Sequence, residues 1–351
     1  MSHLSNEMAR IGIVLPYFGK LPNYFPLFLE SCRQNPTVDW LFYTDSIEDM
    51  PYPENFHVQK LSFSDFRNRI QKSFDFEICL NTPYKLCDFK ATYGDVLQED
   101  LAGYDFWGHC DCDLIFGNIR KFITKDITDN FDRICNCGHL ILYRNIPQVN
   151  RYYREQAYAD YKLILQSPSS YSFDEWPGIS GYWQKDGLPC FGELCYDDIA
   201  NGIDDFRPTQ IFPGGYIGPY HGQPDASVRF RKMRNIVYLY EEGKLERCWL
   251  QNNMIHREEV MYAHFQKRKM QIDTNIFVSH FLAVPNRFTE PVDLTPESIQ
   301  LLAPKKTNRT TMIRILKNWI KIILCDLKNI GKEGYCNNSA IINCVKTYFE
   351  R

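Results

Sequence analysis

The chain has 351 residues, enough for one large α/β domain or two smaller ones with a sizeable core. Hydrophobic residues make up 44% and charged residues 24%, as in ordinary globular proteins, and a net charge of -3 argues against a nucleic-acid partner. The first ten residues are polar and no apolar run reaches membrane-spanning length, so neither a signal peptide nor a transmembrane helix is predicted.

The 13 cysteines are an odd number with no Cys-x-x-Cys pair and no zinc spacing. In a chain of this length we expect them to be small buried apolar side chains rather than a disulfide framework. This cysteine usage predicts a reducing, cytoplasmic environment.

The first part of the chain carries the pattern of a nucleotide-binding sheet. Residues 11–16 form a β-branched run that predicts a strand, and Gly19 permits a tight turn at its carboxyl end, where α/β sheets bind nucleotides. Residues 24–32 have the apolar spacing of a helix, and residues 39–44 predict a second strand. That strand ends at Asp45, which suits a ribose hydroxyl or base and equally suits a turn cap.

A third strand is predicted over residues 58–61, and strands separated by helices favour a largely parallel sheet. Residues 84–94 then predict a short helix that carries Lys85, Asp88 and Lys90. These charges suit a solvated helix face. The functional alternative is that one lysine meets a diphosphate while Asp88 orients it.

The next strand is predicted over residues 104–107, and an Asp-x-Asp pair follows it. On an extended backbone Asp111 and Asp113 would share a face, because side chains alternate with period two. Two such carboxylates can hold a hard divalent cation that takes its other ligands from a diphosphate. The alternative is a surface turn that happens to carry two aspartates. The position after a mid-chain strand favours the metal site.

Residues 133–145 predict one strand with Gly138 near its middle, and glycine in a strand indicates close approach of a ligand or another backbone. His139 beside it suits a sugar hydroxyl or a satisfied core position. Further on, Asp174 and Glu175 lie between aromatic residues, a pattern that suits sugar recognition and proton transfer.

The second half has a loop rich in Gly, Pro and Asp over residues 187–222, interpreted as a lid or insertion on the acceptor side. Residues 237–245 predict a hairpin. A later strand ends at His264, and a basic cluster including Lys267 and Lys269 follows directly. Imidazole can ligate manganese and the cations would suit a diphosphate, whereas the alternative is a basic surface turn.

From Pro304 onward the chain changes character. Ile313, Leu316, Ile320 and Ile323 recur at helical spacing among lysines and arginines. Such a basic amphipathic helix can lie on an anionic membrane surface, and it can equally dock on the domain or form a dimer face.

Together these features resemble GT-A-fold glycosyltransferases, most of all bacterial capsule and lipopolysaccharide enzymes. The resemblance covers residues 11–269. It implies a GT-A-like, Rossmann-like mixed α/β sheet flanked by helices in a domain over residues 1–303, followed by a basic helical tail over residues 304–351. Within that domain, residues 8–117 would be the nucleotide-sugar half and residues 118–303 the acceptor half.

In relatives of the galactosyltransferase and glycogenin kind, Asp-x-Asp and a late histidine bind manganese that bridges to a UDP-sugar. The resemblance thus implies Mn²⁺ or Mg²⁺ on Asp111, Asp113 and His264. This chain has Lys269-Met270 where that group ends its late motif in Lys-Pro-Trp, which leaves the stereochemistry open. Further positions implied are Pro16, Tyr17 and Asp45 by the nucleotide, Lys85, Asp88, Asp111, Lys267 and Lys269 by the diphosphate or donor sugar, Gly138 and His139 beneath that sugar, and the catalytic pair Asp174 and Glu175.

The expected activity is transfer of a hexose from a nucleotide sugar to a saccharide or lipid-linked acceptor in capsule or lipopolysaccharide synthesis. The resemblance implies that the nucleotide is UDP. The expected location is the cytoplasm, at the inner face of the membrane. Two alternatives stay open. One is a metal-dependent nucleotide-sugar hydrolase or phosphodiesterase, which would usually need more ligands for two metals. The other is a non-catalytic sugar-binding protein at the membrane.

Overall fold

The computed structural model of the protein describes residues 7–46, 50–175, 178–192, 196–199, 205–206 and 234–304. The chain divides into two compact units, residues 1–112 with 119–194 and residues 113–118 with 195–351. These units differ from the expected halves 8–117 and 118–303. The reason is that strand β5 (Leu114–Phe116) pairs with strand β13 (Tyr262–His264) of the second unit, and the chain rejoins the first unit at Ile119.

The sheet of the first unit has seven strands in the order β3-β2-β1-β4-β7-β6-β8. Strands β1 to β4 run parallel, whereas β7 runs antiparallel to both β4 and β6, so the sheet is mixed. The predicted α/β class with a mixed sheet is confirmed. The strands are β1 (Ile11–Pro16), β2 (Val38–Thr44), β3 (Phe56–Lys60), β4 (Phe106–Cys110), β6 (Arg133–Cys137), β7 (Leu140–Arg144) and β8 (Cys190–Phe191).

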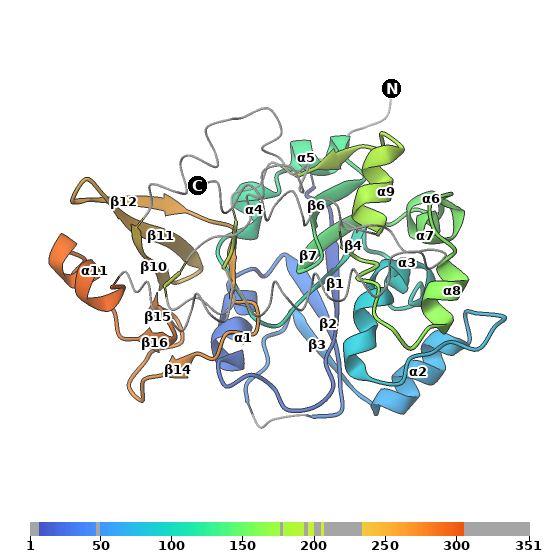
Figure 1. Ribbon diagram of the computed structural model, residues 1–351, viewed down its shortest axis with the longest axis horizontal. Helices are drawn as coiled ribbons and strands as arrows, with labels where there is room; N and C mark the ends of the chain where they lie inside the picture. The colour runs from blue at the N-terminus through green and yellow to red at the C-terminus, as the bar shows by residue number, and fades with distance from the viewer. Residues whose placement is uncertain are drawn as a thin grey trace, which may run out of the picture. The chain divides into compact units, whose positions relative to one another are not determined.

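Helices cover both faces of this sheet. Phe42 and Tyr43 are neighbours on β2, so their side chains point to opposite faces. Phe25 of α1 stacks on Phe42 with ring centroids 5.6 Å apart, and Phe66 of α2 packs on Tyr43 at 5.0 Å, which places the two helices on opposite faces (Figure 1). The helices of this unit are α1 (Phe25–Arg33), α2 (Phe63–Gln71), α3 (Tyr93–Val96), α4 (Ile119–Phe122), α5 (Lys125–Asn130), α6 (Pro147–Asn150), α7 (Tyr152–Glu155), α8 (Tyr161–Gln166) and α9 (Ile179–Lys185).

The helix predicted over residues 84–94 is instead two 3₁₀ segments, η1 (Pro83–Asp88) and η2 (Lys90–Thr92), followed by α3. Side chains at i and i+3 eclipse in a 3₁₀ helix, which brings Lys85 and Asp88 together. Gly94 does not end a helix, because it lies inside α3, where a Cβ would meet the Trp107 ring at 2.3 Å.

The strand predicted over residues 133–145 is a hairpin. Strands β6 and β7 are antiparallel and joined by a turn at Gly138 and His139. Their register shifts between Ile134 and Cys137, where Cys135 has a φ of 65°, the mark of a bulge. The bulge and the turn were not visible in a run of apolar residues.

The described residues of the second unit form two sheets. Its six-stranded sheet has the order β12-β11-β10-β15-β16-β14, and its three-stranded sheet has the order β5-β13-β9. The predicted hairpin is confirmed as β10 and β11, which turn at Glu242 and Gly243 with positive φ at both. The further elements are β9 (Asp197–Asp198), β10 (Arg234–Glu241), β11 (Lys244–Gln251), β12 (Met254–Glu259), β14 (Gln271–Ile272), β15 (His280–Val284), β16 (Arg287–Thr289) and α11 (Pro296–Leu302).

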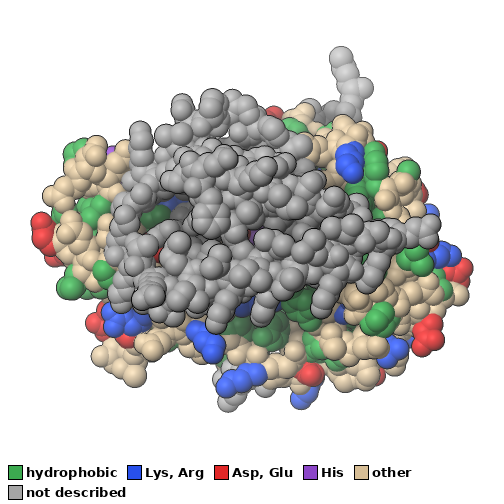
Figure 2. Space-filling view, in the orientation of Figure 1, with side chains coloured by type: hydrophobic (Ala, Val, Ile, Leu, Met, Phe, Trp, Pro, Cys, Tyr) green, Lys and Arg blue, Asp and Glu red, His purple; other side chains and the backbone are tan. Residues whose placement is uncertain are grey.

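In the part of the chain that the structure describes, no helix combines the length and apolar character that crossing a membrane requires. The tail from residue 305 and most of the predicted lid over residues 187–222 lie outside the described residues. On the described surface in Figure 2, Lys and Arg side chains are scattered among acidic and apolar ones rather than gathered in one patch.

Candidate functional site

The carboxyl ends of the central strands of the first unit form the edge that carries the predicted nucleotide residues. Val14 of β1 pairs with His109 of β4, and Pro16 pairs with Tyr43 of β2, so Pro16, Asp45 and Asp111 follow at one edge. The strand order reverses direction between β1 and β4, and α/β sheets bind ligands at such a switch point.

The loop after β1 is closed at this edge by two hydrogen bonds. The Tyr17 N–H donates to the Tyr43 carbonyl at 2.8 Å, and the Gly19 N–H donates to Asp45 Oδ1 at 2.8 Å. Gly19 has a φ of 106°, which favours glycine. Asp45 therefore caps the glycine turn while it remains exposed at the sheet edge.

Lys90, at the start of η2, binds three groups at the same edge. Its Nζ contacts Asp111 Oδ1 at 2.8 Å, the Gly138 carbonyl at 2.8 Å and Asp174 Oδ2 at 3.1 Å. Burial by itself would lower the pKa of Lys90, but Asp111 and Asp174 outweigh it and raise the pKa, so the ammonium stays charged. Lys90 thus links the first aspartate of Asp-x-Asp to the predicted catalytic pair.

Asp174 has the properties of a proton-transfer group. Its side chain is buried, and its Oδ1 has no hydrogen-bond partner among the described residues. Burial raises the pKa of Asp174 to about 7 although Lys90 pulls it down, and Glu175 and Asp111 add to the rise. A carboxyl group with this pKa can take up or release a proton near neutral pH.

The carboxylates of Asp174 and Glu175 lie against Gly138. A Cβ at this position would come within 2.6 Å of both Asp174 Oδ2 and Glu175 Oε1. The Gly138 N–H donates to Glu175 Oε2 at 3.2 Å. Close approach of a ligand or another backbone was expected at this glycine, whereas the structure has the side chains of Asp174 and Glu175 against it. His139 next to it is buried, and its carbonyl accepts the Asp111 N–H at 3.0 Å.

In the second unit, Asp113 meets His264 across the β5–β13 pairing. His264 Nε2 lies 3.2 Å from Asp113 Oδ1, and its Nδ1 lies 2.7 Å from Asp198 Oδ1 on β9. The Gln266 amide donates to the other oxygen of Asp198 at 2.6 Å. Asp113 and Asp198 therefore flank one buried imidazole, and Asp198 fixes the orientation of its ring.

The turn after β13 binds Asp113 through its backbone. The Phe265 N–H donates to the Asp113 carbonyl at 2.9 Å, and the Lys267 N–H donates to Asp113 Oδ2 at 2.6 Å. Gln266 and Lys267 have positive φ values of 49° and 57°, an uncommon conformation that this turn requires. The turn leaves the side chains of Lys267 and Lys269 exposed, whereas Arg268 between them is buried against Asn286.

The opposite charges of His264 and its two aspartates shift the pKa values within this cluster. Burial by itself would lower the pKa of His264, but Asp113 and Asp198 raise it to about 10. Burial would raise the pKa of Asp113, but His264 and the Lys267 N–H lower it to about 2. At neutral pH without metal, an imidazolium thus lies between two carboxylates.

This donor set fits a divalent cation. A metal-binding histidine normally has its second ring nitrogen on a carboxylate, which is the relation of His264 to Asp198. A carboxylate oxygen and the other ring nitrogen face each other at Asp113 and His264, where a cation would replace the shared proton. Carboxylate and imidazole ligands suit Mn²⁺, and carboxylates suit Mg²⁺.

The backbone from Asp111 to Asp113 is a bend and not the extended strand on which the alternation argument depended. Asp111 contacts Lys90, and Asp113 contacts His264. They are separated only by Cys112, so their Cα atoms lie within about 7 Å of each other whatever the arrangement of the units.

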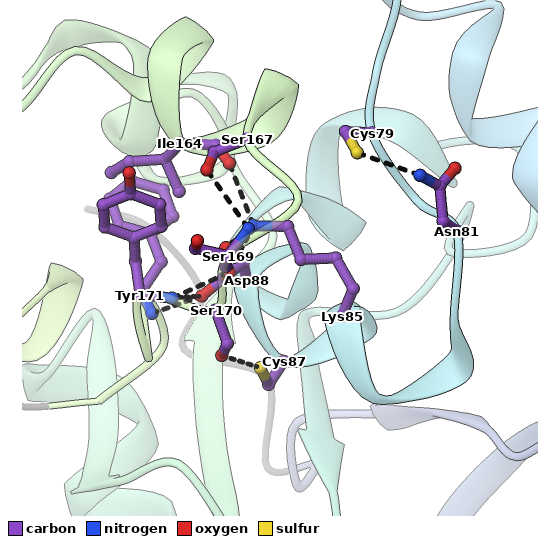
Figure 3. A network of polar contacts seen from close by, with 11 residues as sticks. Cys79, Asn81, Lys85, Cys87, Asp88, Ile164, Ser167, Ser169, Ser170 and Tyr171 are labelled. Atoms are coloured by element: carbon purple, nitrogen blue, oxygen red, sulfur yellow. Dashed lines mark hydrogen bonds and ion pairs between the residues drawn. The ribbon is translucent and has the colours of Figure 1, made fainter.

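The structure gives Lys85 and Asp88 a different place from the one implied by the resemblance. Lys85 Nζ binds Asp88 and two backbone carbonyls, so all three of its donors are used inside the first unit (Figure 3). Lys90 instead is the lysine beside Asp111. Sequence reasoning weighed Lys90 but chose Lys85, and it missed Asp198, for which a pair of aspartates in a Gly/Asp-rich loop was the available signal.

No curated protein matches this chain. A family model described as "Family of unknown function (DUF6625)" matches residues 13–291, which include β1 from Ile13 onward and the Asp-x-Asp, Asp174 and His264 positions. The match spans most of the chain, and the protein therefore belongs to this family.

Proposed function

We propose that the protein is a metal-dependent glycosyltransferase with a GT-A-like fold that transfers a hexose from a nucleotide sugar, UDP-linked by resemblance, to a saccharide or lipid-linked acceptor of capsule or lipopolysaccharide synthesis. The observation that carries the proposal is the carboxylate-backed histidine: Asp198 orients His264, whose Nε2 faces Asp113 of the Asp-x-Asp motif. The mixed sheet with a switch point at β1 and β4 supports a nucleotide donor.

Asp113 and His264 would hold Mn²⁺ or Mg²⁺, and chain connectivity keeps Asp111 close enough to contribute. The bound cation would act as a Lewis acid that offsets the charge of the leaving diphosphate. Asp198 keeps the ligating nitrogen of His264 aimed at the site. Lys267 and Lys269, which are exposed in this turn, would attract phosphate oxygens.

At the sheet edge of the first unit, Pro16, Tyr17 and Asp45 would contact the nucleoside. Asp45 is exposed while its Oδ1 fixes the Gly19 turn, so its second oxygen can accept a ribose hydroxyl. Asp111 follows β4 at the same edge of the sheet, which is consistent with this assignment.

Asp174 is the group that we assign to proton transfer. As the acceptor hydroxyl oxygen bonds to the anomeric carbon, the bond from that carbon to the diphosphate oxygen breaks, and the hydroxyl proton passes to Asp174. A pKa of about 7 suits this role near neutral pH. Lys90 pairs with the Asp174 carboxylate, and Glu175 beside it accepts a hydrogen bond from the Gly138 N–H.

The test is a panel of UDP-sugars assayed with and without Mn²⁺, combining equilibrium binding with analysis of products. We expect manganese-dependent transfer of one hexose to a saccharide acceptor. Release of free sugar in place of transfer would identify a hydrolase, and binding without turnover would identify a sugar-binding protein. Either result contradicts the proposal.

Variants localise the metal within this test. His264→Ala and Asp113→Asn should lose manganese binding measured by titration calorimetry. The matched control is His57→Ala, because His57 also pairs with an aspartate, Asp39 at 3.0 Å, but lies exposed on β3. Equal manganese affinity in His264→Ala and His57→Ala would remove His264 from the metal site.

A further inference from the structure

We propose that the buried pair Lys85–Asp88 is a positioning clamp that fixes the loop over residues 169–173 and thereby sets Asp174 and Glu175 for turnover. This inference rests on the proposed function for the role of Asp174. It replaces the ligand contact implied for Lys85 and Asp88 by a role inside the protein.

Lys85 has no capacity left for a ligand. Its Nζ contacts Asp88 Oδ2 at 2.6 Å, the Ile164 carbonyl at 3.0 Å and the Ser169 carbonyl at 2.5 Å. An ammonium group has three N–H donors, and these contacts use all of them. The side chains of Lys85 and Asp88 are only 4% and 0% exposed, which leaves no open face for a diphosphate.

Asp88 binds the backbone that leads into the predicted catalytic pair. Its Oδ1 accepts the Phe173 N–H at 2.9 Å, and its Oδ2 accepts the Tyr171 N–H at 3.0 Å. Cys87 between the two clamp residues adds a contact from its Sγ to Ser170 Oγ at 3.2 Å (Figure 3). Phe173 immediately precedes Asp174, so the clamp fixes the backbone one residue before the carboxylate.

The same short segment also supplies the cation that Asp174 needs. Segment η1 ends at Asp88 and η2 begins with Lys90, whose Nζ lies 3.1 Å from Asp174 Oδ2. One stretch of chain therefore fixes both the loop that carries Asp174 and the lysine that binds it. A misplaced clamp residue would move both at once.

Stability alone does not account for this arrangement. A buried ion pair often contributes no more than well-packed apolar residues of the same volume, because both charges lose their hydration. What the pair does supply is a fixed geometry through the directed hydrogen bonds of Lys85 and Asp88. Catalytic rates are sensitive to such geometry, since a displacement of about 1 Å can cost about a hundredfold.

The test compares Asp88→Ala, Asp88→Asn and the uncharged double variant Lys85→Met with Asp88→Asn. Three quantities are measured: kcat, the affinity for UDP with Mn²⁺ by equilibrium binding, and hydrogen exchange of the Tyr171 and Phe173 amides without substrate. For Asp88→Ala we expect kcat to fall about 10- to 100-fold, UDP affinity to stay within about twofold, and both amides to lose protection. Asp88→Asn should recover part of kcat, because its amide oxygen still accepts a loop N–H.

The matched control is Arg144→Met. Arg144 at the end of β7 also combines an ion pair, to Asp132 at 2.6 Å, with a bond to a backbone carbonyl, that of Thr128 at 2.7 Å. The Arg144→Met substitution should leave kcat of the folded protein unchanged, and hydrogen exchange of the Tyr171 and Phe173 amides should also stay the same. The double variant carries no unpaired buried charge, so it keeps the test open if Asp88→Ala does not fold.

Three outcomes would overturn the clamp: wild-type kcat in Asp88→Ala, unchanged protection of the two amides, or an equal fall of kcat and UDP affinity. Failure of the proposed function looks different. If the wild-type protein turns over no nucleotide sugar, the transferase assignment fails. The exchange data then decide the positioning of the loop alone: protection lost only over residues 167–175 supports it, and protection kept refutes it.

Discussion

Replacement of Asp174 by asparagine should stabilise the protein, and the gain should depend on pH. Burial raises the folded-state pKa of Asp174 to about 7 from an ordinary value of 3.8, so the carboxylate ionises at a cost to the folded state. The neutral carboxyl group of Asp174 therefore contributes its full share to the free energy of unfolding below about pH 3.8. This contribution decreases as the pH rises and is lost once the pH has passed 7. The difference between these two pKa values corresponds to about 4 kcal/mol.

Asparagine matches the shape of aspartate and does not ionise, so Asp174→Asn should equal the wild type near pH 4. Above pH 7 it should exceed the wild type by up to about 4 kcal/mol in the free energy of unfolding. Lys90 keeps two acceptors in the variant, Asp111 and the Gly138 carbonyl, so its charge stays paired. Turnover should fall sharply, because the proton acceptor is gone.

The measurement is urea unfolding of both proteins followed by circular dichroism at a series of pH values from 4 to 8. Subtracting the two curves cancels the other titrating groups. Asp129→Asn serves as control, since Asp129 forms an exposed ion pair with Lys125 and such pairs contribute about 0–1 kcal/mol. A flat difference would show that the Lys90 ion pair balances the cost of burial, and a wild type that gains on the variant as pH rises would show that the ion pair outweighs it. Either result would refute the reasoning.

Three further predictions concern the metal cluster, the hairpin turn and the tail. His264→Ala should raise the manganese concentration for half-maximal activity by about one to two orders of magnitude, whereas a purely structural histidine would lower only the melting temperature measured without metal. Gly138→Ala places a Cβ 2.6 Å from Asp174 Oδ2 and Glu175 Oε1, so kcat should drop at least about tenfold while UDP binding persists, and an unchanged kcat would contradict the role of this turn. Removal of residues 304–351 should release the protein from anionic vesicles in a sedimentation assay at low salt without loss of turnover in solution, and an intact chain that ignores such vesicles would disprove membrane attachment.

Local pattern was enough to predict several elements. The apolar run over residues 11–16 is β1, the helix predicted over residues 24–32 is α1, and the hairpin over residues 237–245 turns where Gly243 follows Glu242. These elements depend on side-chain periodicity and turn chemistry, which are properties of neighbouring residues. Local pattern did not reveal the hairpin at Gly138, because residues 133–145 are mostly apolar and a lone glycine among them was interpreted as part of one strand.

The sequence showed which residues were candidates for the site, but it did not show which side chains they contact. An Asp-x-Asp after a strand and a histidine at a strand end are visible in the sequence, and the structure pairs Asp113 with His264 within one unit. The sequence did not show which lysine meets Asp111, because Lys85 and Lys90 differ only in how the 3₁₀ segments turn them. Lys85 turns into the interior and Lys90 toward the sheet edge.

The α/β class, the strand-end positions of the acidic residues and the kinds of side chain available for metal and proton chemistry follow from local sequence pattern. Three features follow only from the folded chain: Asp198 supports His264, Asp174 lies buried against Gly138, and Asp111 and Asp113 belong to different units. The physical reason is that pKa values and metal affinity depend on burial and on partners distant in sequence. Those quantities arise only when the chain brings β5, β9 and β13 into one sheet and the hairpin turn against the loop before α9.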